Sequence, residues 1–273
     1  MSYFLQHKHN NLWHGKFSLF PEDIAVHAIS TRQAGVSRNP YDSLNLALHV
    51  GDDEEAVLRN RGIFSASLEV KAEDIVSPQQ VHGDRIFRVT AEHVGRGAGS
   101  YADAIPETDA LITDEPGIPL MLCFADCTPV LFLDPVHKAV GLAHAGWKGT
   151  MKRIAQKTLE AMGREFGTVP GECLAGIGPS IGPCCYEVGS EVAKACHEAF
   201  PGQEEKLLVM RDGKLRFDMW KANRLQLIES GMLPENIESA NTCTACEHAW
   251  YFSYRADGGT TGRIAAMIAL RKY

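Results

Sequence analysis

The chain alternates between short runs of branched and aromatic residues and longer amphipathic segments. The short runs predict strands at residues 24–30, 75–81, 86–89, 110–113, 120–124, 130–133, 139–143 and 174–177. Apolar residues at three-to-four spacing predict a helix at 151–166, and further helices are expected at 54–68, 191–200, 219–230 and 261–270. Strands that come in pairs between helices favour an α/β layered sandwich with mixed β-sheets flanked by helices.

Composition narrows the class of protein. No internal repeat or low-complexity linker divides the 273 residues, so we expect one domain over 1–273. The net charge is −7 and the basic residues are scattered, which argues against a nucleic-acid partner. The N-terminus lacks the layout of a signal peptide, and no apolar run reaches the ~20 residues that span a bilayer. We therefore expect a cytoplasmic protein without a membrane segment, whose 8 cysteines are free thiols or ligands.

A predicted hairpin brings a thiol and an imidazole together. Residues 130–134 and 138–142 flank a connection of the length that closes antiparallel hairpins, at 135–137. If pairing is centred near Val136, Cys127 lies opposite Ala145 and beside His144. Cross-strand neighbours of this kind approach within about 5 to 8 Å. The turn thus predicts that Cys127 and His144 are close in space.

Three interpretations of this pair remain open. Cys127 and His144 could simply be buried core residues, because free cysteine is among the most buried residue types. Cys127 could be a nucleophile with His144 as its base and Asp126 or another acceptor orienting the ring. A metal site would need a third ligand, and the best candidate is His82, which follows an apolar strand and precedes a glycine.

Other polar and sulfur-bearing motifs have weaker interpretations. The C-x-x-C of Cys243 and Cys246, together with the vicinal pair Cys184 and Cys185, could build a second zinc site or a redox pair. A second C-x-x-C at finger-like spacing is missing, so we expect packing thiols beside a site. Arg255, after an aromatic run, could present its guanidinium to a phosphate or carboxylate. A polar loop after the first strand carries Arg32 and Asn45.

Taken together, the motifs of this chain resemble one family. From Ser30 to about Arg263 the sequence is similar to the YfiH/YlmD-type laccase-domain proteins, also called polyphenol oxidoreductase-like proteins or purine nucleoside phosphorylases. The motifs that carry the resemblance occur in the family's order: Ser30-Thr-Arg-x-x-Gly-Val-Ser37, Ser43-Leu-Asn-Leu46, Gln80-Val-His-Gly83, Ala125-Asp-Cys-x-Pro129, His144-Ala-Gly-Trp-Lys-Gly149, Gly178-Pro-x-Ile-x-x-Cys-Cys-Tyr-Glu-Val188 and Tyr251-Phe-Ser-Tyr-Arg255.

The resemblance implies a fold, a metal and an activity. The implied fold is a single-domain sandwich similar to cysteine-hydrolase-like toxin domains. The implied metal is zinc, held by His82, Cys127 and His144. The implied reaction is phosphorolysis of adenosine, inosine, guanosine or methylthioadenosine, with adenosine deaminase activity as well. The chain departs from the family at Lys148, where arginine is usual, which keeps the charge but not the bidentate fork.

These implications define the hypotheses to be compared. In a zinc phosphorylase, Arg32, Asn45, Lys148 and Arg255 would bind the purine nucleoside and phosphate. In deamination, Asp126 could shuttle protons, although it could instead orient a ligand. Alternatives are a cysteine hydrolase with Cys127 as nucleophile, a copper-dependent polyphenol oxidoreductase, and a binding module without catalysis. The oligomeric state is expected to be monomer or homodimer.

Overall fold

Two large sheets form the centre of the molecule. The computed structural model describes residues 3–7 and 12–272. The first sheet is antiparallel throughout and has the order β1-β2-β3-β13-β6. Its strands are β1 (Phe4–His7), β2 (Trp13–Lys16), β3 (Ala25–Ser30), β13 (Ile264–Leu270) and β6 (Leu120–Phe124).

The second sheet is mixed and has the order β12-β9-β7-β8-β5-β4. Its outer pairs, β12 with β9 and β4 with β5, are parallel, and the inner pairs are antiparallel. Its strands are β12 (Ile237–Ser239), β9 (Leu174–Ile177), β7 (Thr128–Asp134), β8 (Ala139–Ala145), β5 (Ala110–Thr113) and β4 (Ile86–Arg88). The prediction of mixed sheets rather than a strict βαβ winding is confirmed.

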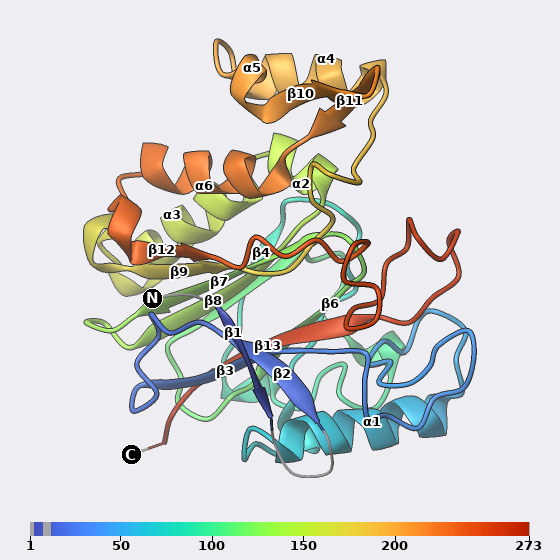
Figure 1. The fold of residues 1–273 in the computed structure, drawn as a ribbon. Coiled ribbons are helices and arrows are strands. Elements are labelled where there is room, and N and C mark those ends of the chain that lie inside the picture. The colour runs from blue at the N-terminus through green and yellow to red at the C-terminus, as the bar shows by residue number, and fades with distance from the viewer. Residues whose placement is uncertain (1–2, 8–11, 273) are drawn as a thin grey trace.

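The sheets and helices stack in layers (Figure 1). One hydrophobic cluster fills the space between the two sheets. A second packs the mixed sheet against α3 (Ile154–Phe166) and α6 (Met219–Glu229), and a third packs the antiparallel sheet against α1 (Glu54–Ala66). The layered α/β sandwich predicted from the sequence is therefore confirmed, while the likeness to cysteine-hydrolase-like toxin domains stays a prediction.

A smaller group of elements lies beyond α6 at the top of Figure 1. It consists of α4 (Ser190–Ala199), α5 (Glu204–Leu207), β10 (Leu208–Arg211) and β11 (Lys214–Phe217), and a hydrophobic cluster packs it against α6. The connections elsewhere contain one-turn 3-10 helices at Ala72–Asp74, Ala91–His93, Tyr101–Asp103, Pro170–Glu172 and Pro234–Asn236.

The predicted helix at 261–270 is wrong, because residues 264–270 form the central strand β13. Ile264 and Ile268 face the core between the sheets, whereas Ala265 and Met267 face α1. Both faces of the strand are buried, so its sequence is apolar without interruption. Such a run does not distinguish a buried strand from a buried helix by its period.

Two other predicted elements need correction. Residues 75–81 make only isolated bridges, Val76 with Leu120 and Pro78 with Ile105, because proline cannot donate to a ladder. The helix predicted at 151–166 is α3, which begins three residues later than predicted, because Arg153, with φ +63°, separates it from the short helix α2 (Trp147–Met151). The strands β1, β2, β10, β11 and β12 were not predicted, and all have three or four residues.

Candidate metal-binding cavity

The β7–β8 hairpin carries two of the predicted site residues to one edge of the mixed sheet. Its register differs by one residue from the prediction, since Thr128, not Cys127, lies opposite Ala145, and Pro129 lies opposite His144. Cys127 ends the bend between β6 and β7, immediately before the paired residues begin. The predicted proximity of Cys127 and His144 is nevertheless confirmed, because the hairpin places both at the same end of the sheet.

Gly146, next along the chain, allows this close approach. A Cβ atom at this position would lie 2.9 Å from Cys127 Sγ and 3.1 Å from the Cδ2 atom of His82. Both distances are shorter than ordinary van der Waals contacts of a carbon atom with sulfur or with another carbon. A side chain on the residue after β8 would therefore displace Cys127 or His82, and glycine leaves room for the three groups to meet.

His82 reaches the hairpin from a loop that a buried carboxylate holds in place. The loop residue has φ +57°, in the left-handed region. Asp109 accepts hydrogen bonds from the backbone N–H groups of Val81, His82 and Gly83, at 3.2, 3.0 and 2.7 Å. The side-chain amide of Gln80 makes two hydrogen bonds to the backbone of Cys123 on β6. Its Nε2 donates to the carbonyl oxygen and its Oε1 accepts from the N–H, both at 2.8 Å. These contacts position His82 independently of any ligand.

The same carboxylate orients His144. Asp109 Oδ1 lies 2.8 Å from Nδ1 of this imidazole, and its carbonyl oxygen accepts a 2.8 Å bond from the His144 backbone N–H. A histidine held through Nδ1 presents Nε2 to a metal or to an acidic proton. Sequence reasoning did not identify Asp109, although an acidic residue directly before an apolar strand was a signal that could have found it.

The ligand atoms of His82, Cys127 and His144 all lie within 4.8 Å of one another. Burial would raise the pKa of the Cys127 thiol, but His144 and His82 outweigh it and lower this pKa to about 6. Burial would conversely lower the pKa of His144, but the thiolate and Asp109 raise it to about 9. The group therefore favours thiolate and imidazolium when no metal is bound, and two imidazoles with a thiolate form a donor set that suits zinc.

A cavity of about 570 Å³ opens beside this group. Its lining combines two guanidinium groups with aromatic rings and polar side chains: His49, Gln80, His82, Cys123, Ala125, Asp126, Cys127, His144, Trp147, Ile181, Tyr186, Tyr254, Arg255 and Arg263. Burial, aided by the charge of Arg263, lowers the pKa of His49 to about 4, so that this ring is neutral near pH 7. The volume is in the range of small-molecule sites.

The two arginines are held by backbone carbonyl groups. Arg255 Nη1 donates to Glu187 O at 3.2 Å, and Arg263 Nη1 donates to the carbonyl oxygens of Thr261 and Gly262, at 2.6 and 3.0 Å. A carbonyl orients a guanidinium without neutralising its charge. Arg263 was not among the predicted site residues, although its place after the glycine-rich loop at 258–262 was a usable signal.

Three of the residues predicted to bind substrate are not in the described lining of this cavity. Arg32 donates to the carbonyl oxygen of Asp42 at 2.9 and 3.0 Å, and its guanidinium lies over the ring of the buried Phe252. Lys148 is exposed on α2, with its ammonium over the Trp147 ring. Asn45 is buried and accepts the backbone N–H of Arg263 at 2.9 Å, so it supports the cavity from behind.

Asp126 lines the cavity, and both of its carboxylate oxygens are hydrogen-bonded. Oδ1 accepts from Thr244 Oγ1 at 2.6 Å, and Oδ2 accepts from the Arg255 backbone N–H at 2.7 Å. The chain bends at this residue, which has φ +79°. The geometry favours the positioning role over proton transfer, because the carboxylate ties the segment of Arg255 to the bend that carries Cys127.

The chain matches known proteins along most of its length. Residues 26–271 match the family model described as multi-copper polyphenol oxidoreductase laccase. The chain is 42% identical over 251 residues to "Purine nucleoside phosphorylase YlmD" of Geobacillus stearothermophilus, covering 91% of each chain. It is 36% identical over 242 residues to "Adenosine deaminase RL5" of an unknown prokaryotic organism, covering 87% of this chain and 91% of the relative.

The solved structure of YlmD from Geobacillus stearothermophilus superimposes with a TM-score of 0.92 at 39% identity, covering 98% of this chain and 99% of that one. The chain therefore belongs to the YfiH/YlmD family of laccase-like proteins. Among the described residues, no helix is both long and apolar enough to cross a bilayer.

Proposed function

We propose that the chain is a zinc-dependent purine nucleoside phosphorylase, built as one catalytic domain over residues 1–273 and acting in the cytoplasm as a monomer or homodimer. The observation that carries this proposal is one cavity that joins the His82, Cys127 and His144 group to two guanidinium groups and several aromatic rings. The names of the relatives support it. Adenosine, inosine, guanosine and methylthioadenosine are the proposed nucleosides.

The three ligands fit zinc by donor chemistry and by support. His144 is held through Nδ1 by Asp109, and His82 is held through its backbone by the same carboxylate. Zinc with three protein ligands keeps a position for water or substrate, and it supplies Lewis acidity that polarises an oxygen or nitrogen atom placed beside it. Copper is the alternative metal, as the name of the matching family model suggests.

Phosphorolysis needs an anion held against the ribose while charge develops on both fragments. Arg255 and Arg263 bind the phosphate through their unneutralised guanidinium charge. The rings of Tyr186, Tyr254 and Trp147 provide apolar faces for the purine. Asn45 and Asp126 act as positioning residues, because each holds the backbone of one of these arginines.

The test is a product assay on purified, zinc-loaded protein. Inosine with phosphate should yield hypoxanthine and ribose 1-phosphate, and omission of phosphate should abolish both. Arg263→Lys should raise the KM for phosphate, whereas Lys148→Ala, which removes an exposed charge outside the cavity, should not. If the nucleosides named above release no base in the presence of phosphate, the proposal is wrong.

Adenosine deamination is a second activity for the same site, supported by the relative named adenosine deaminase. Inosine formation from adenosine without phosphate would detect it. A cysteine hydrolase is a further candidate, because Cys127, His144 and Asp109 are arranged in the order of thiol, base and orienting carboxylate. Zinc removal should then increase hydrolysis of an activated ester, whereas a zinc enzyme should lose nucleoside turnover.

A further inference from the structure

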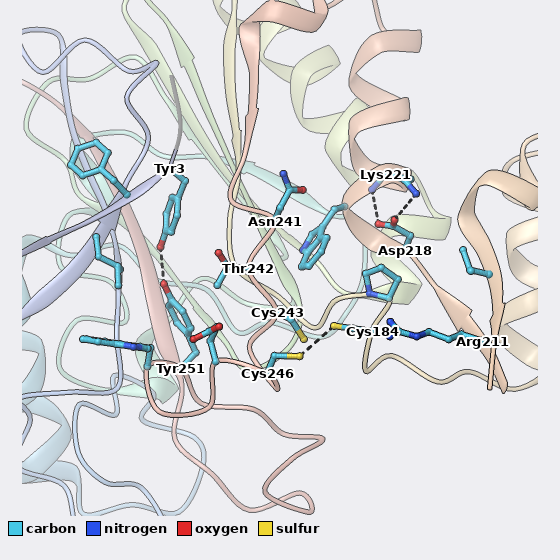
Figure 2. Close-up of a pocket in the computed structure, with 17 residues that line it drawn as sticks. Tyr3, Cys184, Arg211, Asp218, Lys221, Asn241, Thr242, Cys243, Cys246 and Tyr251 are labelled. Atoms are coloured by element: carbon cyan, nitrogen blue, oxygen red, sulfur yellow. Dashed lines mark hydrogen bonds and ion pairs between the residues drawn. The ribbon is translucent and has the colours of Figure 1, made fainter. Parts of the chain in front are cut away.

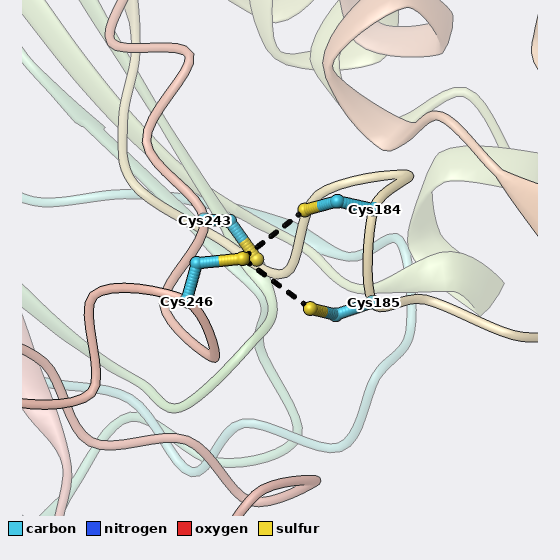
Figure 3. Close-up of side chains that lie close together, drawn as sticks. All are labelled: Cys184, Cys185, Cys243 and Cys246. Carbon is cyan, nitrogen blue, oxygen red and sulfur yellow. Dashed lines mark hydrogen bonds between the residues drawn. The ribbon is translucent and has the colours of Figure 1, made fainter.

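Four cysteines come together outside the cavity described above. Cys184 and Cys185 lie in the loop that follows β9, and Cys243 and Cys246 lie in the segment that follows β12. Their four Sγ atoms are all within 4.8 Å of one another, and Figure 3 shows the side chains converging from the two loops. We refer to these residues as the four-cysteine cluster.

The spacing of the sulfur atoms suits a tetrahedral metal. Cys246 Sγ lies 3.4 Å from the sulfur atoms of both Cys184 and Cys185. Four thiolates at the usual zinc–sulfur distance stand about 3.8 Å apart, so small side-chain rotations would create the site. A disulfide would instead need one pair of sulfur atoms to approach to about 2.05 Å, away from the other two.

The backbone holds the two loops together without help from the sulfur atoms. Ser180 donates its N–H to Thr242 O at 3.2 Å, and Thr244 returns a bond to Ser180 O at 3.1 Å. The turn at 182–186 is closed by bonds from the N–H groups of Cys185 and Tyr186 to Gly182 O, both 2.9 Å. The thiols are thus preorganised by contacts that would persist in the metal-free protein.

The surroundings also supply what a thiolate site requires. The backbone N–H of Gly182 donates to Cys243 Sγ at 3.2 Å, a contact that stabilises a thiolate. Zinc with four thiolates carries a net negative charge. Arg216 donates to Cys184 O, and Arg211 lines the same cavity of about 740 Å³ as Cys184 and Cys246 (Figure 2). These two arginines supply positive charge near the cluster.

We propose that Cys184, Cys185, Cys243 and Cys246 bind one zinc ion in a structural site, separate from the His82, Cys127 and His144 group. All four positions of the tetrahedron are taken by protein ligands, and closed sites of this kind stabilise a fold rather than bind substrate. Cys246 is exposed and Cys243 is buried, so the metal has a path from solvent and an anchored inner ligand.

The site has a consequence for the main cavity. The loop that carries Cys184 and Cys185 also supplies Ile181 and Tyr186 to the lining of the main cavity. The chain beyond Cys246 supplies Tyr254 and Arg255. The Arg255 guanidinium lies over the Tyr186 ring, with 5.4 Å between its Cζ and the ring centroid. A metal that joins the two loops would hold this wall of the cavity in shape.

Metal analysis of the purified, reduced protein tests the proposal without reference to activity. The parent should contain two zinc ions per chain, and Cys127→Ser and Cys246→Ser should each contain one. The matched control is Cys196→Ala, at a buried free thiol in α4, which should keep both ions. If Cys246→Ser retains as much zinc as the parent, the proposal is overturned.

A spectrum covers the case in which Cys246→Ser does not fold. The Cys127→Ser protein, loaded with Co²⁺, retains only the four-cysteine cluster as a thiolate site. Sulfur-to-cobalt charge-transfer bands with the intense d–d bands of tetrahedral cobalt would support the site, and their absence would refute it. This result is independent of the proposed phosphorylase, because it requires no turnover.

Discussion

The His82, Cys127 and His144 group projects from strand ends and a carboxylate-bound loop, whereas the four-cysteine cluster projects from two loops joined by backbone hydrogen bonds. The first group has three donors and faces a cavity. The second has four donors and ties two loop segments to each other. The number of ligands and the presence of a cavity beside them therefore separate a site suited to chemistry from one suited to structure.

The largest expected difference between the two groups is in turnover. Cys127→Ala should reduce the rate of phosphorolysis at least about 100-fold, because it removes a proposed zinc ligand rather than a residue that only holds a ligand in place. Cys246→Ser should keep kcat within about tenfold and should mainly raise the KM values for nucleoside and phosphate, because it loosens the wall that carries Tyr186 and Arg255. Steady-state kinetics with zinc-loaded proteins measures both. Equal losses of kcat in the two variants would contradict the division of roles.

The role of Asp109 can be tested against a matched carboxylate. Asp109→Asn should weaken zinc binding at the cavity about 10- to 100-fold, because the amide replaces an acceptor shared by three N–H groups and His144. Competition with a chelator measures the affinity. Asp134→Asn is the control, since Asp134 is equally buried and holds His137 Nδ1 at 2.9 Å in the hairpin turn, away from the cavity. Equal affinities in both variants would remove Asp109 from the site.

Alkylation of the metal-stripped protein should also distinguish the two groups. The pKa of Cys127 is lowered to about 6, so its thiolate is present above pH 6 and its alkylation rate should reach half of its maximum near that pH. Burial and neighbouring thiols raise the pKa of Cys184, so alkylation there should rise only in alkaline solution. Mass spectrometry of peptides gives the rate at each cysteine. His144→Ala should move the Cys127 midpoint upward, because it removes the principal charge that stabilises the thiolate.

The same pKa shifts predict how pH affects the stability of the metal-free protein. The thiol pKa of Cys127 is lowered from 9.0, so its contribution to stability is lost as pH falls toward about 6. The pKa of His144 is raised from 6.5, so its contribution is lost as pH rises toward about 9. Urea unfolding of the parent relative to Cys127→Ala should show the largest difference between these two pH values. A difference that does not vary with pH would contradict the ion pair.

The smallest expected effects concern two glycines. Gly146→Ala should weaken zinc binding at the cavity by a few fold and leave the four-cysteine cluster unchanged, because the new methyl group would press on Cys127 Sγ. Gly62→Ala, in α1, where the added Cβ would meet no atom within 4 Å beyond its chain neighbours and the adjacent helix backbone, should raise the free energy of unfolding by about 0.5–1 kcal/mol. Metal analysis and thermal unfolding measure the two effects. A loss of stability in Gly62→Ala would show that the helix is packed differently.

Patterning along the chain predicted most of the longer elements and failed where tertiary contacts decide. The runs at 110–113 and 120–124 became strands with the same bounds, because their residues are buried between layers. The run at 261–270 was misassigned because β13 is buried on both faces and so carries no period. The short strands, such as β12 with three residues, have too little sequence to show alternation.

Local geometry predicted that Cys127 and His144 lie together, whereas family resemblance supplied the metal and its third ligand, His82. A short turn sufficed to bring Cys127 and His144 together, although the pairing register was out by one residue. Arg32 and Lys148 were chosen for their charge, and the structure directs one to a carbonyl and leaves the other in solvent. Charge is visible in a sequence, but the direction of a long side chain depends on groups that are distant along the chain.

From the order of its residues alone, this chain specified a layered α/β sandwich, a hairpin that pairs a thiol with an imidazole, and membership of a family. Folding decided which residues surround that pair. Asp109 lies 35 positions from His144 along the chain, and Cys184 lies 62 from Cys246, yet each meets its partner directly. Local patterns follow from steric and hydrophobic preferences of neighbouring residues, whereas such contacts exist only after the sheets have packed and the loops at their edges have been held together.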